Sequence, residues 1–215
     1  MSTLTVSDSS ADAPRAARQL QSKMAAARVS FTRFGMRKTL TPEQKAEAAD
    51  AFGAEGQYLS AGKKLLDTRH PRFKAVTAIR HATVEYLRLL SLAFPEPGIR
   101  LIPQDRLDEF QERLNGFKVE LDAAVRDLDR NFDALKGAAR ERLGRLFNPH
   151  DYPVTLTGLF DVAWDFPSVQ APDYLRELDP ALYRAECQRV QARFEEAVRL
   201  PSRRLSTNWP GWSGT

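Results

Sequence analysis

Apolar residues recur at intervals of three and four along residues 104–147, a stretch that contains no proline. This spacing places one apolar stripe on a single helix face and predicts a continuous helix, roughly 65 Å long at about 1.5 Å per residue. A stripe of this length must be buried along most of its extent, which indicates an elongated helical bundle of the coiled-coil kind. The stripe comprises Leu107, Phe110, Leu114, Phe117, Leu121, Ala124, Leu128, Phe132, Leu135, Ala139, Leu143 and Leu146.

A second amphipathic helix is predicted over residues 71–94, where Pro95-Glu96-Pro97-Gly98 ends it. The short connection between the two helices predicts an antiparallel hairpin. The first arm, roughly 35 Å long, cannot cover the second, so part of the stripe should stay exposed. We expect the following residues to form an adhesive, protein-binding face: Leu128, Phe132, Leu135 and Leu143.

Alternation with a period of two predicts strands at two distant places in the chain. One is Val29–Lys38, with a bulge near Arg33, and the other covers Phe160–Phe166. We predict that they pair as a small antiparallel β-ribbon, residues about 29–38 with 157–167, and that Ile99–Ile102 adds a third strand. The pairing would place two carboxylates, Asp161 and Asp165, beside three bases, Arg33, Arg37 and Lys38.

The remaining segments predict shorter helices, at residues 14–27, 42–52 and 57–67. The clearest helix start is Thr41-Pro42-Glu43-Gln44, which has the order of a capped N-terminus with proline at the first helical position. The predicted fold is therefore mainly α: an elongated antiparallel helical hairpin or bundle with a small β-ribbon. Residues 14–200 should form a single domain, preceded by a Ser/Thr/Asp-rich disordered tail at residues 1–13.

The last residues, 201–215, depart from the pattern that precedes them. Pro201 stops a helix that is still amphipathic, and two tryptophans, two glycines and two prolines follow without an acidic residue. A shifted reading of codons that can encode residues 200–212 continues the amphipathic helix in phase. We therefore interpret residues 201–215 as an aberrant, disordered tail produced by a frameshift near Arg199; a functional aromatic tail is the alternative.

Composition narrows the class of protein further. The content is 42% hydrophobic and 28% charged, as in a soluble globular protein, and the N-terminus has no secretory signal. No run is long and apolar enough for a membrane helix, so no membrane partner is expected. A single cysteine, Cys187, cannot form an internal disulfide. These features favour a cytoplasmic location for the protein.

No catalytic, metal-binding or cofactor-binding motif is present, and no cofactor is expected. The histidines His70, His81 and His150 are too scattered for a ligand set. The net charge of +4 has its densest basic cluster between residues 63 and 74. Five residues there form a candidate polyanion-binding patch at a helix junction: Lys63, Lys64, Arg69, Arg72 and Lys74. Clusters of this kind are more often simply solvated.

Four segments carry a resemblance to a known group of proteins: GMRKTLTPEQKAEAADAFGAEGQYLSAGKKLLD, PEPGIRLIPQ, LGRLFNPHDYP and FDVAWDFPSV. Over residues 20–200 the chain resembles a family of uncharacterised bacterial proteins, whose members continue as helix where this chain departs at residue 201. More distantly, it is similar to a domain of unknown function encoded beside MoxR-type AAA+ ATPase and von Willebrand A-domain genes. The resemblance supplies no catalytic residue and implies a partner protein in an ATPase-linked or mobile-element system.

The sequence thus favours a non-enzymatic protein–protein interaction or scaffold module. Its partner would be an AAA+ ATPase, a von Willebrand A-domain protein, or a second copy of the chain. The alternative is a nucleic-acid-binding accessory protein that uses the basic patch Lys63–Lys74. Whether the distal stripe is covered within the chain discriminates the two: if it is covered, the basic patch becomes the better candidate.

Overall fold

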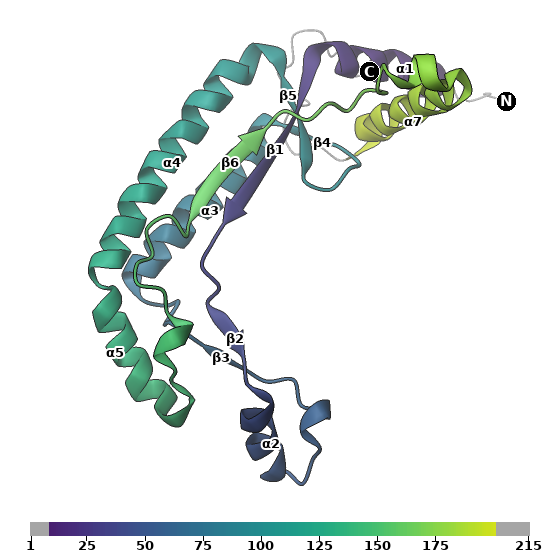
Figure 1. Cartoon of the computed structure of the whole chain (residues 1–215). Helices are drawn as coiled ribbons and strands as arrows, with labels where there is room; N and C mark the ends of the chain where they lie inside the picture. Colours follow the sequence, from purple (N-terminus) through teal and green to yellow (C-terminus); the bar gives the residue numbers. More distant parts are fainter. Residues whose placement is uncertain (1–8, 201–215) are drawn as a thin grey trace, which may run out of the picture. The chain divides into compact units, whose positions relative to one another are not determined.

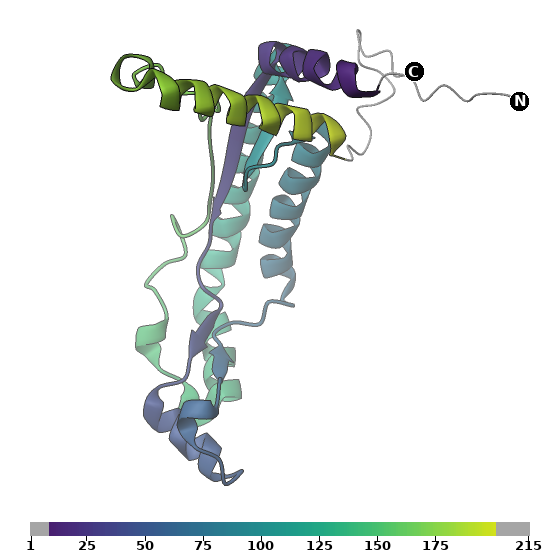
Figure 2. The same ribbon diagram turned by 90° about the vertical axis from the view of Figure 1, so that its right-hand side faces the viewer.

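A computed structural model describes residues 9–200 of the chain (Figures 1 and 2). These residues form seven α-helices, a four-stranded sheet and a separate two-stranded ribbon, which confirms the mainly α class. They divide into two compact units. Unit 1 contains residues 9–30, 83–115 and 163–200, and unit 2 contains residues 31–82 and 116–162. Four elements contribute residues to both units: β1 (Met24–Thr32), α3 (Pro71–Leu90), α4 (Leu107–Arg130) and β6 (Asp161–Asp165).

Unit 1 contains the four-stranded sheet together with the first and the last helix of the described residues. Helix α1 begins at Ser9, earlier than the predicted start at residue 14, while residues 1–8 and 201–215 lie outside the described part. The elements that contribute to unit 1 are α1 (Ser9–Lys23), β1 (Met24–Thr32), α3 (Pro71–Leu90), β4 (Leu92–Ala93), β5 (Ile99–Pro103), the 3-10 turn η2 (Gln104–Arg106), α4 (Leu107–Arg130), β6 (Asp161–Asp165), α6 (Leu175–Leu178) and α7 (Pro180–Arg199).

The sheet has the strand order β4-β5-β1-β6. Strand β1 pairs antiparallel with β5, with Ala26 opposite Leu101, so the predicted third strand is confirmed. On the other edge of β1 lies β6, where Ser30 Oγ donates to the Ala163 carbonyl at 3.4 Å. The two strands that the alternating patterns predict are therefore neighbours.

Helices α1 and α7 pack against each other and share an apolar core with the sheet. Phe94 and Phe194 meet edge to face, with ring centroids 5.2 Å apart. Both rings are buried, and burying a side chain of this size contributes about 1.5–3 kcal/mol. The N-terminus of α7 is capped by Asp179, whose carboxylate accepts from the backbone amides of Ala181 and Leu182.

Unit 2 contains the short ribbon and the second half of the apolar stripe. Its α2 begins as predicted, because Thr41 and Gln44 form a reciprocal capping box. In addition to the ends of the shared elements, unit 2 contains β2 (Arg37–Thr39), α2 (Pro42–Asp50), the 3-10 turn η1 (Gly56–Tyr58), β3 (Gly62–Lys64), α5 (Phe132–Leu143), and the 3-10 turns η3 (Gly144–Leu146) and η4 (Pro149–Asp151).

The ribbon corrects two predictions. The strand expected over residues 29–38 is interrupted at residues 33–36, and β2 pairs with β3, at a place where a helix over 57–67 was predicted. Gly62 permits this pairing, because a Cβ there would lie only 3.1 Å from the Lys38 carbonyl oxygen. The predicted ion pairs with Arg33, Arg37 and Lys38 are consequently wrong. Asp165 instead lies 3.5 Å from Arg28 Nε, and Asp161 lies 2.9 Å from Lys118 Nζ.

The predicted continuous helix over residues 104–147 is also wrong, because α4 ends at Arg130 and α5 starts at Phe132. Asn131 between them has φ −109° and ψ 8°, outside the helical region, and its side-chain amide donates to the Asp127 carbonyl at 3.0 Å. An asparagine side chain that takes a backbone carbonyl competes with the helical hydrogen bond. Figure 1 shows the chain changing direction between α4 and α5 at this point.

Within unit 2, residues 152–156 contact the end of α4 and the start of α5. Tyr152 packs on Phe132, with ring centroids 6.5 Å apart. Asp129 accepts hydrogen bonds from the Thr155 hydroxyl at 2.8 Å and the Leu156 amide at 2.7 Å. The expected exposure is therefore absent for two of the four adhesive residues, since Leu128 is 0% and Phe132 2% exposed. The other two, Leu135 and Leu143, are half-buried.

Candidate functional site

The β2–β3 ribbon carries two pairs of directly opposed basic residues. Arg37 lies opposite Lys64, and Lys38 lies opposite Lys63. Because successive side chains of a strand point to opposite faces, each face of the ribbon carries one pair. Like charges that face each other across a ribbon are destabilising. Each pair therefore favours the approach of an anion.

On one face of the ribbon, Asp151 of η4 provides that anion. Its two carboxylate oxygens lie 2.7 Å from Lys38 Nζ and 2.6 Å from Lys63 Nζ. The side chains of Asp151 and Lys63 are only 4% and 5% exposed, and Lys63 Nζ also donates to the Leu146 carbonyl at 2.6 Å. Burial by itself raises the pKa of Asp151, but the hydrogen bonds from both lysines outweigh it and lower that pKa below its usual value. The carboxylate stays ionised and neutralises this face.

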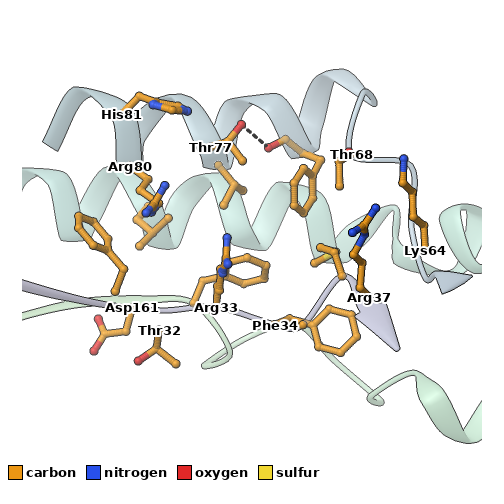
Figure 3. A pocket seen from close by; sticks show the side chains of 17 residues that line it. Thr32, Arg33, Phe34, Arg37, Lys64, Thr68, Thr77, Arg80, His81 and Asp161 are labelled. Atoms are coloured by element: carbon orange, nitrogen blue, oxygen red, sulfur yellow. Dashed lines mark hydrogen bonds between the residues drawn. The ribbon is translucent and has the colours of Figure 1, made fainter. Parts of the chain in front are cut away.

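On the other face, Arg37 and Lys64 line a partly open cavity of about 500 Å³ within unit 2. Figure 3 shows Arg33 and Arg37 extending from the segment 31–37 toward α3, while Arg80 extends from α3 toward that segment. The four basic side chains Arg33, Arg37, Lys64 and Arg80 are exposed, and within residues 9–200 none of them forms an ion pair. The one carboxylate in the lining, Asp161, is already bound to Lys118. We call this space the basic cavity.

Aromatic and other apolar side chains also line the basic cavity. Phe73 and Phe160 are buried, whereas Phe31 and Phe34 are half-buried. The guanidinium of Arg80 lies over the ring of Phe31, 5.3 Å from its centroid, which is a cation–π contact. Cations and aromatic rings therefore alternate around the same space.

The structure disperses the basic patch predicted at residues 63–74. Lys63 is nearly buried and neutralised by Asp151, whereas Lys64 lines the basic cavity. Arg69 Nε lies 3.5 Å from Asp67, and Arg72 Nε lies 2.9 Å from Asp127. Lys74 is exposed on α3 but does not line the cavity. Of the five predicted residues, Lys64 alone belongs to the site.

Three basic residues of the cavity, Arg33, Arg37 and Arg80, were missing from the predicted patch. A usable pattern was present, because residues 31–38 read Phe-Thr-Arg-Phe-Gly-Met-Arg-Lys and interleave aromatic with basic side chains. Arg33 and Arg37 were instead predicted to pair with Asp161 and Asp165. Asp151 was not predicted to contact the ribbon, because nothing local shows that η4 meets it.

In the described part of the chain, no group of three or more His, Cys, Asp or Glu side chains could hold a metal ion. His81 lines the basic cavity, while His150 makes a local contact with Asn148. The basic cavity is thus suited to an anionic ligand.

Neither a family model, nor a curated protein, nor a solved structure matches this chain. Across residues 9–200, no helix combines the length and the apolar character that crossing a membrane requires.

Proposed function

We propose that this chain is a non-enzymatic nucleic-acid-binding protein and that unit 2 holds backbone phosphates in the basic cavity. One observation carries the proposal: among residues 9–200 the opposed pair Arg37 and Lys64 has no carboxylate partner, whereas the equivalent pair on the other face, Lys38 and Lys63, has Asp151. The Asp151 carboxylate therefore shows which kind of group an opposed basic pair of this ribbon binds.

A phosphate diester is the external group that best replaces such a carboxylate. It offers two anionic oxygens, as Asp151 does, and an arginine guanidinium can bind both of them in a bidentate manner. Lys64 adds a compact point charge on the same face of the ribbon. Arg33 and Arg80 extend the positive charge from the ribbon to α3.

The number and arrangement of the charges favour a polyanion over a single small anion. Four basic side chains in the cavity lining form no ion pair within residues 9–200. The one carboxylate in the lining, Asp161, is already paired with Lys118. The phenylalanines in the lining favour nucleic acid over an acidic protein as the ligand, because nucleobases stack on aromatic rings and carboxylate side chains do not. Phosphate contacts bring no sequence preference, so binding should tolerate many sequences.

The test is fluorescence anisotropy with a labelled oligonucleotide of mixed sequence. We expect binding at about 50 mM salt that weakens as the salt concentration is raised. The logarithm of the binding constant should fall with the logarithm of salt concentration with a slope of about −3 if all four basic side chains contact phosphates of a single strand. The variant Arg37→Glu should weaken binding at least tenfold. The control is Arg184→Glu, an exposed residue of α7 that gives the same change in net charge. Equal weakening by both variants, or no binding at 50 mM salt, contradicts the proposal.

A protein-interaction surface on α5 is a weaker second candidate. It retains Leu135 and Leu143, which are half-buried, but loses Leu128 and Phe132 to the interior. If this surface mediates self-association, Leu135→Glu should convert an oligomer to a monomer in light scattering. An unchanged mass would remove this candidate.

A further inference from the structure

The geometry points to single-stranded rather than double-stranded nucleic acid as the ligand, with an unstacked base on Phe34 next to the phosphate held by Arg37 and Lys64. This inference rests on the proposed function and specifies the ligand of the same cavity. It follows from the way in which the aromatic side chains of the cavity are used.

Phe34 differs from the three other phenylalanines that line the cavity. Phe73 and Phe160 are buried as part of the unit 2 interior, and the face of Phe31 is occupied by Arg80. Phe34 is half-buried, and within residues 9–200 it makes no ring contact with another aromatic side chain or a cation. Its ring is the aromatic surface of the cavity that remains for a ligand.

Phe34 and two of the phosphate-binding residues belong to the same short segment of the chain. Residues 33–36 have no regular structure and connect the end of β1 to β2. Arg33 therefore precedes the ring directly and Arg37 follows it by three residues, and Figure 3 shows both guanidinium groups on the side of the segment that faces α3.

A duplex cannot use this combination. Its bases are stacked on each other and paired, so their faces are unavailable unless a base is extruded at a cost of a few kcal/mol. A single strand presents unstacked bases, and proteins that bind single strands combine a basic groove with aromatic stacking platforms. A basic cavity with an accessible phenylalanine matches that combination, whereas a purely cationic surface would serve a duplex equally well.

The experiment compares a labelled single-stranded oligonucleotide with the duplex of the same sequence, at about 50 mM salt, by fluorescence anisotropy. We expect tighter binding of the single strand. Phe34→Leu keeps an apolar side chain but removes the ring, and should weaken single-strand binding roughly five- to hundredfold while leaving duplex binding unchanged. Phe34→Tyr restores a ring and should restore most of the affinity, which excludes a simple folding defect.

Phe52→Leu is the matched control, because Phe52 is a phenylalanine of the same unit that is 83% exposed and does not line the cavity. It should leave affinity unchanged. Equal affinity for duplex and single strand, together with an inert Phe34→Leu and a still impaired Arg37→Glu, overturns this inference and leaves the proposed function intact. Binding of neither nucleic acid overturns both. Equal binding of polyglutamate shows a non-specific polyanion site and also overturns the inference.

Discussion

Arg37 and Lys64 face each other across the β2–β3 ribbon at a position without backbone hydrogen bonds between the two residues. The flanking bonds join Leu65 N to the Met36 carbonyl and Leu40 N to the Ala61 carbonyl, so the alternation of an antiparallel ladder leaves Arg37 and Lys64 at a non-bonded pair. Side chains approach most closely at such pairs. The native ribbon therefore keeps two positive charges together at a cost in stability.

Arg37→Glu should consequently have opposite effects on stability and on binding. Glutamate opposite Lys64 replaces a repulsive pair by an attractive one, which should stabilise the fold by roughly 0.2–1 kcal/mol. The same change removes the phosphate-binding guanidinium. Thermal unfolding followed by circular dichroism measures the first effect and anisotropy the second. A variant that loses both stability and binding would show that Arg37 has a structural role instead.

Asp151→Asn should destabilise the protein by about 3 kcal/mol. Removing one partner of a buried ion pair leaves the other charge uncompensated, and Lys63 is almost fully buried. The value lies at the low end of the usual range because Lys63 keeps its hydrogen bond to the Leu146 carbonyl. Urea unfolding checks the loss. Combining the change with Lys63→Met should recover part of it, and a double variant as unstable as the single one would refute this explanation.

Acid should weaken unit 2 through Asp67. The backbone amide of Arg69 and the guanidinium of Arg142 donate to its carboxylate at 2.9 and 2.8 Å and lower its pKa from 3.8 to about 2. Because the pKa is lower in the folded state, the stabilisation is present above about pH 4 and is lost as the pH falls toward 2. Asp67→Asn should therefore lower the urea midpoint at pH 7, and the difference from the native chain should shrink by pH 2.5.

Asp133→Asn is the control for this acid effect, because Asp133 has a side chain that is 95% exposed and pairs only with its helical neighbour Lys136. Exposed pairs of this kind contribute little. The control should match the native chain at both pH values. If the two variants behave alike, the contacts of Asp67 do not stabilise the fold.

Gly137, within α5, and Gly144, its C-cap, should respond to alanine in opposite directions. Gly144 ends the helix with φ +50°, a region unfavourable for residues with a Cβ, so Gly144→Ala should cost about 1–2 kcal/mol. Gly137 is exposed within the helix, and a Cβ there would meet nothing within 4 Å. Gly137→Ala should therefore stabilise by about 0.5–1 kcal/mol. Thermal unfolding of both variants tests the pair, and a shift in the same direction for both would be inconsistent with these backbone conformations.

Local features of this fold were predictable from sequence, and interruptions were not. The N-cap at Thr41 and the strand at Ile99 depend on neighbouring residues and were predicted. The break at Asn131 was not, because Leu128, Phe132 and Leu135 keep the spacing of four and three across it. A one-residue interruption that preserves the phase of the stripe leaves no trace in the hydrophobic pattern.

The candidate site depends on strand register, which sequence alone did not supply. Lys63 and Lys64 are adjacent in the chain and looked equivalent, yet a strand directs them to opposite faces. One is neutralised in the interior by Asp151 and the other lines the basic cavity. The acid that separates their roles comes from a distant 3-10 turn, so only the folded chain shows which lysine remains available.

The segment of residues 147–160 contacts Phe132 through Tyr152 and Asp129 through Leu156, so its removal would expose apolar surface on this helix face. Cleavage by a protease within that segment would release it from the helix face and expose apolar side chains. The cleaved protein should therefore aggregate, whereas the intact protein should remain monodisperse under the same conditions.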